Sequence, residues 1–73
     1  MKKNKLTPRE TEIMNLLIKG YNNPDISKKL KISPHTTKAH LASIYGKFNA
    51  NNRIEAIIMY IKENKDILDK SDK

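Results

Sequence analysis

The chain has 73 residues, no cysteine and a formal net charge of +7 at pH 7. This length leaves room for one small hydrophobic core, and the lack of cysteine excludes disulfides and thiolate metal sites and favours a cytoplasmic location. No apolar stretch approaches the roughly 18 residues of a membrane span. The sequence therefore predicts a single soluble domain with no membrane partner.

The positive charge is unevenly distributed along the chain. Four acidic and four basic residues between positions 62 and 73 balance one another, so the excess lies before them. A folded domain with its positive charge concentrated in this way attracts polyanions, meaning DNA, RNA or anionic lipid. Solubility alone is the alternative explanation of a lysine-rich composition.

The three prolines mark three helix starts, because each follows a residue whose side chain can cap a helix: Thr7-Pro8, Asn23-Pro24 and Ser33-Pro34. The first start is also a capping box, TPRE, in which Glu10 can reach back to Thr7. The first helix is expected at about residues 8–19, ending at Gly20, and a basic lead of residues 1–5 precedes it.

A second helix is expected at about residues 24–30, with Ile26 and Leu30 on its buried side. Only Lys31 and Ile32 separate this helix from the Ser33 cap. The second and third helices are therefore expected to be joined by a tight turn.

The third predicted helix, about residues 34–48, contains no acidic residue. The helical period places one set of side chains toward the core: Thr37, Leu41, Ile44 and Phe48. The opposite, outward set consists of His35, Lys38, Ala39, Ala42 and Gly46. This outward face is small, basic and free of acids.

A fourth helix is predicted at about residues 52–64, with Asn51 or Asn52 as its cap. Its isoleucines cover more than the single stripe that a small core requires: Ile54, Ile57, Ile58 and Ile61. We interpret the surplus as a dimer interface. Residues 6–65 then form the domain, and residues 66–73 form a charged tail.

A helix packed before two helices that are joined by a short turn is the helix-turn-helix arrangement. A helix in the major groove lies between two phosphate chains, where an acid would be repelled. Ala39 and Ala42 would allow close approach to base edges and contact thymine methyl groups, and Lys38 could reach guanine or a phosphate. Ser33 and Thr36 suit a phosphate oxygen. Alternatively, the alanines are only good helix formers on a solvated surface.

The segment LTPRETEIMNLLIKGYNNPDISKKLKISPHTTKAHLASIYGKFNANNRIEAI closely resembles the LuxR-type helix-turn-helix domain, also called the GerE or NarL/FixJ output domain. The resemblance covers almost the whole chain. It implies an all-α, four-helix fold and a transcription regulator that binds double-stranded DNA as a homodimer on paired half-sites. It also implies that the third helix reads the major groove.

The resemblance also assigns roles to individual residues. It places Lys38, Ala39 and Ala42 at base-facing positions, and His35 joins them on the outward face. The positions that cap, brace or contact the DNA backbone are Asn23, Ser33, Thr36, His40 and Lys47. Arg53 begins the fourth helix, which commonly forms the dimer contact. Glu10 is expected to form an ion pair with Arg53.

Several residues depart from the usual pattern of that family. Thr37 stands where Val is common, a change expected to alter packing rather than chemistry. Pro24 and Asp25 replace typical Lys and Glu, which makes the second helix less basic. Ala42 occupies a site that is often Lys, Arg or Asn, which reduces the base reading expected there.

Other functions fit the sequence less well than DNA binding. His35 and His40 are five residues apart, with no cysteine or carboxylate close by in sequence, so neither a catalytic nor a metal role is expected, and no cofactor. The three tyrosines are too dispersed for an RNA-stacking surface. A sigma-factor-type helix-turn-helix remains a competitor, as does a helical protein-interaction module that has lost DNA binding. RNA polymerase is a further expected partner.

Overall fold

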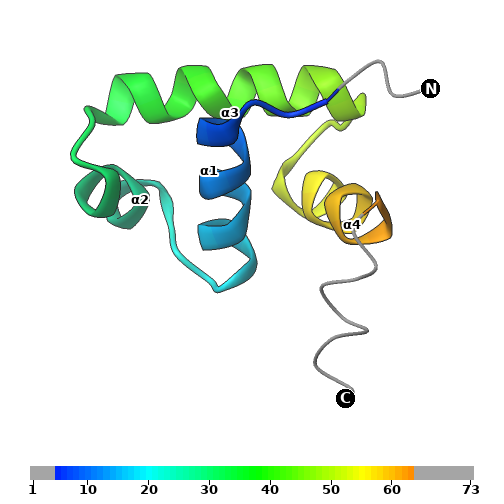
Figure 1. Cartoon of the computed structure of the whole chain (residues 1–73), viewed down its shortest axis with the longest axis horizontal. Helices are drawn as coiled ribbons and strands as arrows, with labels where there is room; N and C mark the ends of the chain where they lie inside the picture. Colours follow the sequence, from blue (N-terminus) through cyan, green and yellow to red (C-terminus); the bar gives the residue numbers. More distant parts are fainter. Residues whose placement is uncertain (1–4, 64–73) are drawn as a thin grey trace.

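The computed structural model describes residues 5–63, which fold into four α-helices and no strand. The helices are α1 (Pro8–Ile18), α2 (Asn23–Leu30), α3 (Pro34–Phe48) and α4 (Arg53–Glu63). In Figure 1, α3 lies along the top, α1 runs crosswise beneath its middle, α2 lies below its first turn and α4 below its last turn. The predicted all-α, four-helix architecture is confirmed. The tail at residues 66–73 and nearly all of the basic lead lie outside the described residues.

Side-chain caps fix the starts of the helices. The Thr7 hydroxyl accepts a hydrogen bond from the Glu10 N–H at 3.1 Å, and the Glu10 carboxylate accepts one from the Thr7 N–H at 2.9 Å, which confirms the predicted capping box. The Ser33 hydroxyl accepts from the Thr36 N–H at 3.0 Å. At α4, Asn52 accepts from the Glu55 N–H at 2.9 Å.

The predicted cap of α2 was wrong by one residue. The side chain of Asn22 accepts from the Asp25 N–H at 2.9 Å, and Asn23 is the first helical residue. Both asparagines can cap a helix, but the side-chain oxygen of Asn23 is bonded to Arg53 instead. Pro24 therefore follows the first helical residue rather than the cap.

Backbone conformations with positive φ end the first three helices. Gly20, just past α1, has φ +98°, a value that glycine adopts without steric cost. Lys31 after α2 and Asn49 after α3 take the left-handed conformation, with φ 58° and 57°. Because the left-handed Lys31 is followed only by Ile32 and Ser33 before α3 begins, the tight turn between the two helices is confirmed.

The core lies between α3 and the other three helices, and α3 packs against each of them. The inward face predicted for α3 is buried, including the fully enclosed Ile44 and Thr37. The rings of Phe48 and Tyr60 join α3 to α4, with centroids 6.4 Å apart. The buried apolar side chains are Ile13, Met14, Leu16, Leu17, Ile26, Leu41, Ile44, Phe48, Ala56 and Tyr60.

One buried polar pair links the two helices of the helix-turn-helix. The hydroxyl oxygens of Ser27 on α2 and Thr37 on α3 are 2.7 Å apart, and both residues are buried. The Ser27 hydroxyl also donates to the carbonyl of Asn23 at 2.9 Å. Thr37 therefore changes the chemistry of this contact as well as its packing, contrary to the expectation from sequence.

None of α1 to α4 combines the length and the apolar character that a membrane-crossing helix requires.

Candidate nucleic-acid interface

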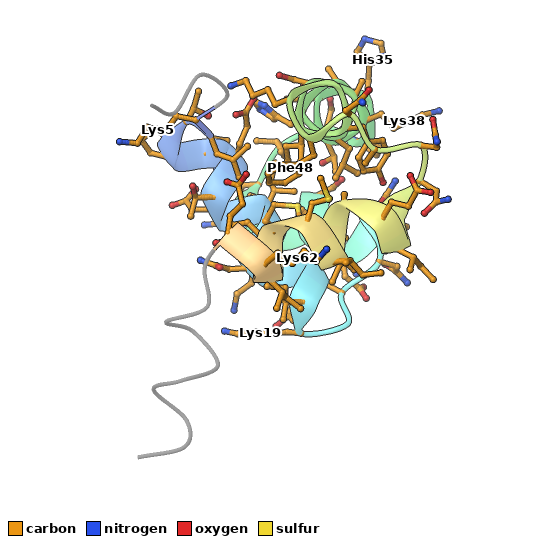
Figure 2. All side chains as sticks on the ribbon, turned by 90° about the vertical axis from the view of Figure 1, so that its right-hand side faces the viewer. Lys5, Lys19, His35, Lys38, Phe48 and Lys62 are labelled. Atoms are coloured by element: carbon orange, nitrogen blue, oxygen red, sulfur yellow. The ribbon has the colours of Figure 1, made fainter. Side chains whose placement is uncertain are left out.

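The outward face of α3 is exposed along its whole length. Its members are His35, Lys38, Ala39, Ala42 and Gly46, and every one of them is solvent-exposed. In Figure 2, where α3 is seen end-on at the top, the side chains of His35 and Lys38 project away from the rest of the domain. No acidic residue occurs on α3. A phosphate chain could therefore approach this face without meeting a carboxylate on the helix.

Two hydroxyl groups lie at the start of α3. The Ser33 hydroxyl donates to the Thr36 hydroxyl oxygen at 2.9 Å and accepts from the Thr36 N–H at 3.0 Å. Since the Thr36 oxygen acts as the acceptor, its own hydroxyl hydrogen is available to an external acceptor. His40, one turn further along, is half-buried.

Arg53 ties the start of α4 to the start of α2. Its Nη2 donates to Oδ1 of Asn23 at 2.8 Å, and its Nη1 donates to the carbonyl oxygen of Tyr21 at 3.3 Å. The expected ion pair between Glu10 and Arg53 was therefore wrong. Because α4 begins beside the α1–α2 connection, Arg53 reaches that connection rather than the first turn of α1.

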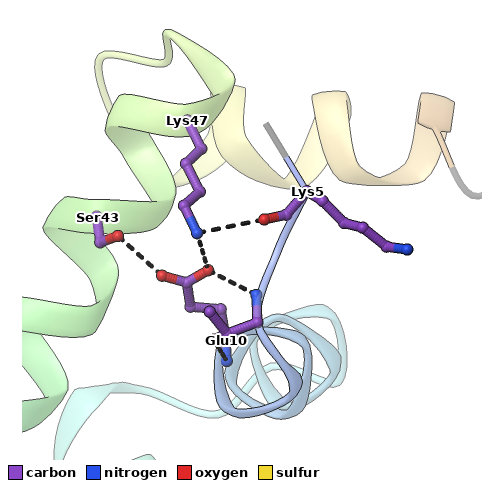
Figure 3. A network of polar contacts seen from close by, with 5 residues as sticks. Lys5, Glu10, Ser43 and Lys47 are labelled. Atoms are coloured by element: carbon purple, nitrogen blue, oxygen red, sulfur yellow. Dashed lines mark hydrogen bonds and ion pairs between the residues drawn. The ribbon is translucent and has the colours of Figure 1, made fainter. Parts of the chain in front are cut away.

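Glu10 instead binds α3, as Figure 3 shows. Its carboxylate accepts from Nζ of Lys47 at 2.7 Å, from the Ser43 hydroxyl at 2.8 Å and from the Thr7 N–H at 2.9 Å. Lys47 also donates to the carbonyl oxygen of Lys5 at 3.2 Å. The contribution of Ser43 was missed from sequence, because it lies 33 positions from Glu10 and no local pattern relates the two.

These contacts set the charge of Glu10. Burial by itself would raise its pKa, but hydrogen bonds from Lys47, the Thr7 N–H and Ser43, together with the Lys47 charge, outweigh burial and lower the pKa to about 2. The carboxylate therefore stays ionised and holds the Lys47 ammonium against α1. The structure places this ammonium in an intramolecular contact rather than leaving it free toward solvent.

A shallow hollow lies beside α3. It has a volume of about 260 Å³ and is lined by Asn23, Lys38, Leu41, Ala42 and Tyr45. The hollow thus joins two of the predicted base-facing residues, Lys38 and Ala42, to a predicted backbone-contact residue of α2, Asn23. Tyr45 was not among the predicted interface residues, although it follows Leu41 and Lys38 at the helical spacing of one face.

The isoleucines of α4 divide into two groups. Ile54 and Ile58 are 66% and 49% exposed, and Met59 beside them is 37% exposed. Ile57 and Ile61 are half-buried, and Ile57 packs against the core. We call Ile54, Ile58 and Met59 the α4 apolar surface. Met59 was missed from sequence because a methionine among isoleucines does not signal which face is exposed.

Within residues 5–63, no three His, Cys, Asp or Glu side chains lie close enough together to hold a metal ion. His35 and His40 lie on α3 with no carboxylate of that helix beside them.

A supporting helix, a short helix, a tight turn and an exposed acid-free helix together define a DNA-binding domain of the helix-turn-helix class. The family of bacterial regulatory proteins of the luxR type, GerE, matches residues 4–60. The chain belongs to this family.

The chain is similar to bacterial regulatory proteins. The chain is 42% identical over 57 residues to the transcriptional regulatory protein DegU of Brevibacillus brevis, an alignment that covers 78% of this chain and 24% of DegU. It is 37% identical over 59 residues to the response regulator protein VraR of Staphylococcus aureus, covering 81% of this chain and 28% of VraR. The chain thus spans about a quarter of the length of these relatives.

Solved structures share the fold. The response regulator ChrA of a heme-sensing two-component system superposes with a TM-score of 0.80 at 36% identity, covering 86% of this chain and 31% of ChrA. The phage VqmA–DPO complex superposes with a TM-score of 0.79 at 32% identity, covering 85% of this chain and 28% of VqmA.

Proposed function

We propose that this domain binds double-stranded DNA in a sequence-dependent manner and regulates transcription by placing α3 in the major groove. The observation that carries the proposal is the outward face of α3, which is exposed from His35 to Gly46 and has no acid. An α-helix fits the width of the major groove, and small residues such as Ala39 and Ala42 let its backbone approach the base edges. A net charge of +7 adds attraction to the phosphates.

The roles within the interface follow from exposure and available donors. The proposed base-facing residues are His35, Lys38, Ala39 and Ala42, all exposed on one side of α3. The proposed backbone contacts are Asn23, Ser33, Thr36 and His40 at the groove edges. Lys47 was expected to join them, but a phosphate would have to compete with Glu10 for its ammonium. We therefore assign Lys47 chiefly to bracing α3.

Dimerisation through α4 is the second part of the proposal. On the α4 apolar surface, the exposed Ile54 and Ile58 lie at i, i+4 spacing and so form one apolar strip, and Met59, which follows Ile58 in sequence, lies to one side of it. A second copy of the domain would remove this strip from water. Ile57 and Ile61 contribute at its half-buried edge. Two copies related by a two-fold axis would place their α3 helices about 34 Å apart, one turn of DNA.

The setting of this activity is the cytoplasm, where the DNA lies. RNA polymerase is a further proposed partner, because a regulator bound beside a promoter lies next to that enzyme. The proposed role is binding, without a catalytic step or a cofactor.

Selection of bound duplexes from a random pool at physiological salt tests the proposal. We expect a recovered motif with two half-sites whose centres are about 10 base pairs apart. Binding to the recovered duplex should weaken steeply as salt is raised, because bound counterions are displaced from the phosphates. A pool that emerges without any enriched sequence would contradict sequence-dependent binding.

A further inference from the structure

We propose that the hollow beside α3 receives one sugar-phosphate unit of the bound DNA strand, and that Arg53 positions the Asn23 amide to hold its phosphate. This inference rests on the proposed function and assigns a subsite within it. It also gives roles to Tyr45 and Arg53, which act outside the base-facing set.

The hollow combines an apolar floor with unpaired hydrogen-bond donors. Leu41 and Ala42 supply the apolar part, and Asn23, Lys38 and Tyr45 surround it. Within residues 5–63, the side-chain nitrogens of Asn23 and Lys38 and the hydroxyl of Tyr45 form no hydrogen bond with the protein. No acidic side chain lines the hollow. Such a lining suits an anion that carries an apolar ring, which describes a deoxyribose with its phosphate.

Arg53 determines which end of the Asn23 amide is available to a ligand. An asparagine side chain has one acceptor oxygen and one NH₂ donor group. Nη2 of Arg53 occupies the oxygen at 2.8 Å, which leaves the NH₂ group as the free part of the side chain. The second Arg53 bond, to the carbonyl of Tyr21 at 3.3 Å, fixes the guanidinium itself. The arginine thus presents the amide as a donor and adds positive charge behind it.

The position of the hollow fits a phosphate better than a base. It extends from α3 toward the start of α2, away from the strip of Ala39 and Gly46 that faces outward. A helix in the major groove has the sugar-phosphate chains along its sides and the bases in front of it. Lys38 and Ala42 lie where the two surfaces meet. The hollow therefore lies where a strand backbone would pass.

The Asn23→Asp substitution is the central test. It keeps the shape of the side chain and replaces the hydrogen bond between the Arg53 guanidinium and the amide oxygen with an ion pair, so folding should be retained. It also removes the NH₂ donor and adds a negative charge. The matched control is Asn22→Asp, which adds the same charge one residue away and preserves a good helix cap. Tyr45→Phe, with Tyr21→Phe as its control, removes only a hydroxyl from the hollow.

Binding is measured on the selected duplex with single phosphates replaced by neutral methylphosphonates. For the wild-type domain, replacement at one or two adjacent phosphates per half-site should lower affinity about tenfold, the size expected for a charge-assisted hydrogen bond. In Asn23→Asp the affinity for unmodified DNA should fall by at least this factor, and the same replacements should have little further effect. Arg53→Lys, which keeps the charge but loses the planar fork, should weaken sensitivity to the same phosphates. The preferred base sequence should be unchanged in Asn23→Asp, Tyr45→Phe and Arg53→Lys, which we call the hollow variants.

The outcomes separate this inference from the proposed function. If the wild-type domain binds DNA and Asn23→Asp keeps the full methylphosphonate profile, the hollow holds no phosphate and this inference fails alone. If the hollow variants change the selected base sequence, the hollow reads bases and the inference fails as well. If the wild-type domain binds no duplex at low salt, both proposals fail.

Discussion

The ammonium of Lys47 on α3 lies 2.7 Å from the carboxylate of Glu10 on α1, and the Glu10 side chain is only 5% exposed. This contact fastens the last turns of α3 to the supporting helix. The Ser43 hydroxyl, one turn earlier on α3, binds the other carboxylate oxygen at 2.8 Å. One buried acid of α1 therefore binds two residues in the last turns of α3 and holds this end of the helix against α1.

Stability should depend on pH through Glu10. Its folded-state pKa is lowered from 4.5 to about 2, so the ionised form is favoured in the folded state. The stabilisation is complete above about pH 5 and is lost as the pH falls toward 2. We expect the free energy of unfolding, measured with urea, to fall by roughly 2 to 3 kcal/mol between pH 6 and pH 2 from this group.

Glu10→Gln should lower stability at pH 6 and remove this part of the pH dependence. The control is Glu12→Gln, because Glu12 forms an exposed pair with Arg9 at 3.2 Å and should change stability by less than about 1 kcal/mol. Should Glu10→Gln prove too unstable to study, Ser43→Ala removes one of the hydrogen bonds with a smaller loss. If Glu10→Gln and Ser43→Ala both lost stability between pH 6 and pH 2 as the wild type does, Glu10 would not stabilise the fold.

Lys38→Glu should abolish binding to duplex DNA. The substitution places a negative charge on the outward face of α3, where it would meet phosphates and guanine acceptors. Fluorescence anisotropy with labelled duplex at 50 mM and 200 mM salt measures the effect. Lys19→Glu is the matched control, because Lys19 lies at the end of the molecule far from α3 (Figure 2). Equal losses in both variants would indicate that net charge alone governs binding.

Replacing Ile54 or Ile58 with Lys should prevent pairing of two domains without unfolding either one. Both side chains are exposed, so a lysine there stays in water in the monomer but would be buried against a partner. Sedimentation velocity on a duplex with two half-sites should show one bound domain in place of two at limiting protein. The control is Glu12→Lys, an exposed site on α1. Circular dichroism should be unchanged; loss of helicity would instead assign these isoleucines to the core.

The buried hydroxyl pair of Ser27 and Thr37 should show energetic coupling. Ser27→Ala or Thr37→Val alone breaks the 2.7 Å contact and should cost about 1 kcal/mol. The double variant replaces both hydroxyls with apolar groups and should be less destabilised than the sum of the two single variants. Urea unfolding of the four proteins measures the difference. Additive effects would mean that the two hydroxyls are bonded independently.

The two glycines should respond to alanine in opposite directions. Gly20→Ala forces an alanine to adopt φ +98° and should destabilise the domain by about 1 kcal/mol. Gly46→Ala adds a methyl group to an exposed site on the helix, where no atom of another segment lies within 4 Å, and should stabilise the helix by about 0.5 to 1 kcal/mol. Thermal unfolding compares them directly. A Gly46→Ala variant that is less stable than the wild type would contradict the description of α3 at this point.

Features that depend on neighbours in sequence could be predicted. The Thr7 and Ser33 caps and the inward face of α3 follow from spacings of three or four residues, and Gly20, just past the end of α1, is a residue type that stops a helix. Such relations are fixed by the geometry of the helix itself. The helix predicted at about residues 34–48 accordingly corresponds to α3, Pro34–Phe48.

Features that depend on how the helices pack could not be predicted. Asn22 and Asn23 are both able to cap, and the choice between them is decided by Arg53, 30 positions away, which binds Asn23. The partner of Glu10 was likewise decided by which of Lys47 and Arg53 the packing brings near α1. The sequence pattern identified Glu10 and Arg53 as paired residues, but not that each binds a different partner, Lys47 and Asn23.

The small size of Ala39, Ala42 and Gly46 has a consequence for how the protein would find its targets. A helix face with so few long side chains that donate hydrogen bonds can distinguish only a few base pairs, and a chromosome contains a very large number of chance copies of any short DNA sequence. A single domain would therefore be distributed over these competing sites. Occupancy of a particular promoter would then depend on how many domains bind next to one another there, rather than on the affinity of each domain.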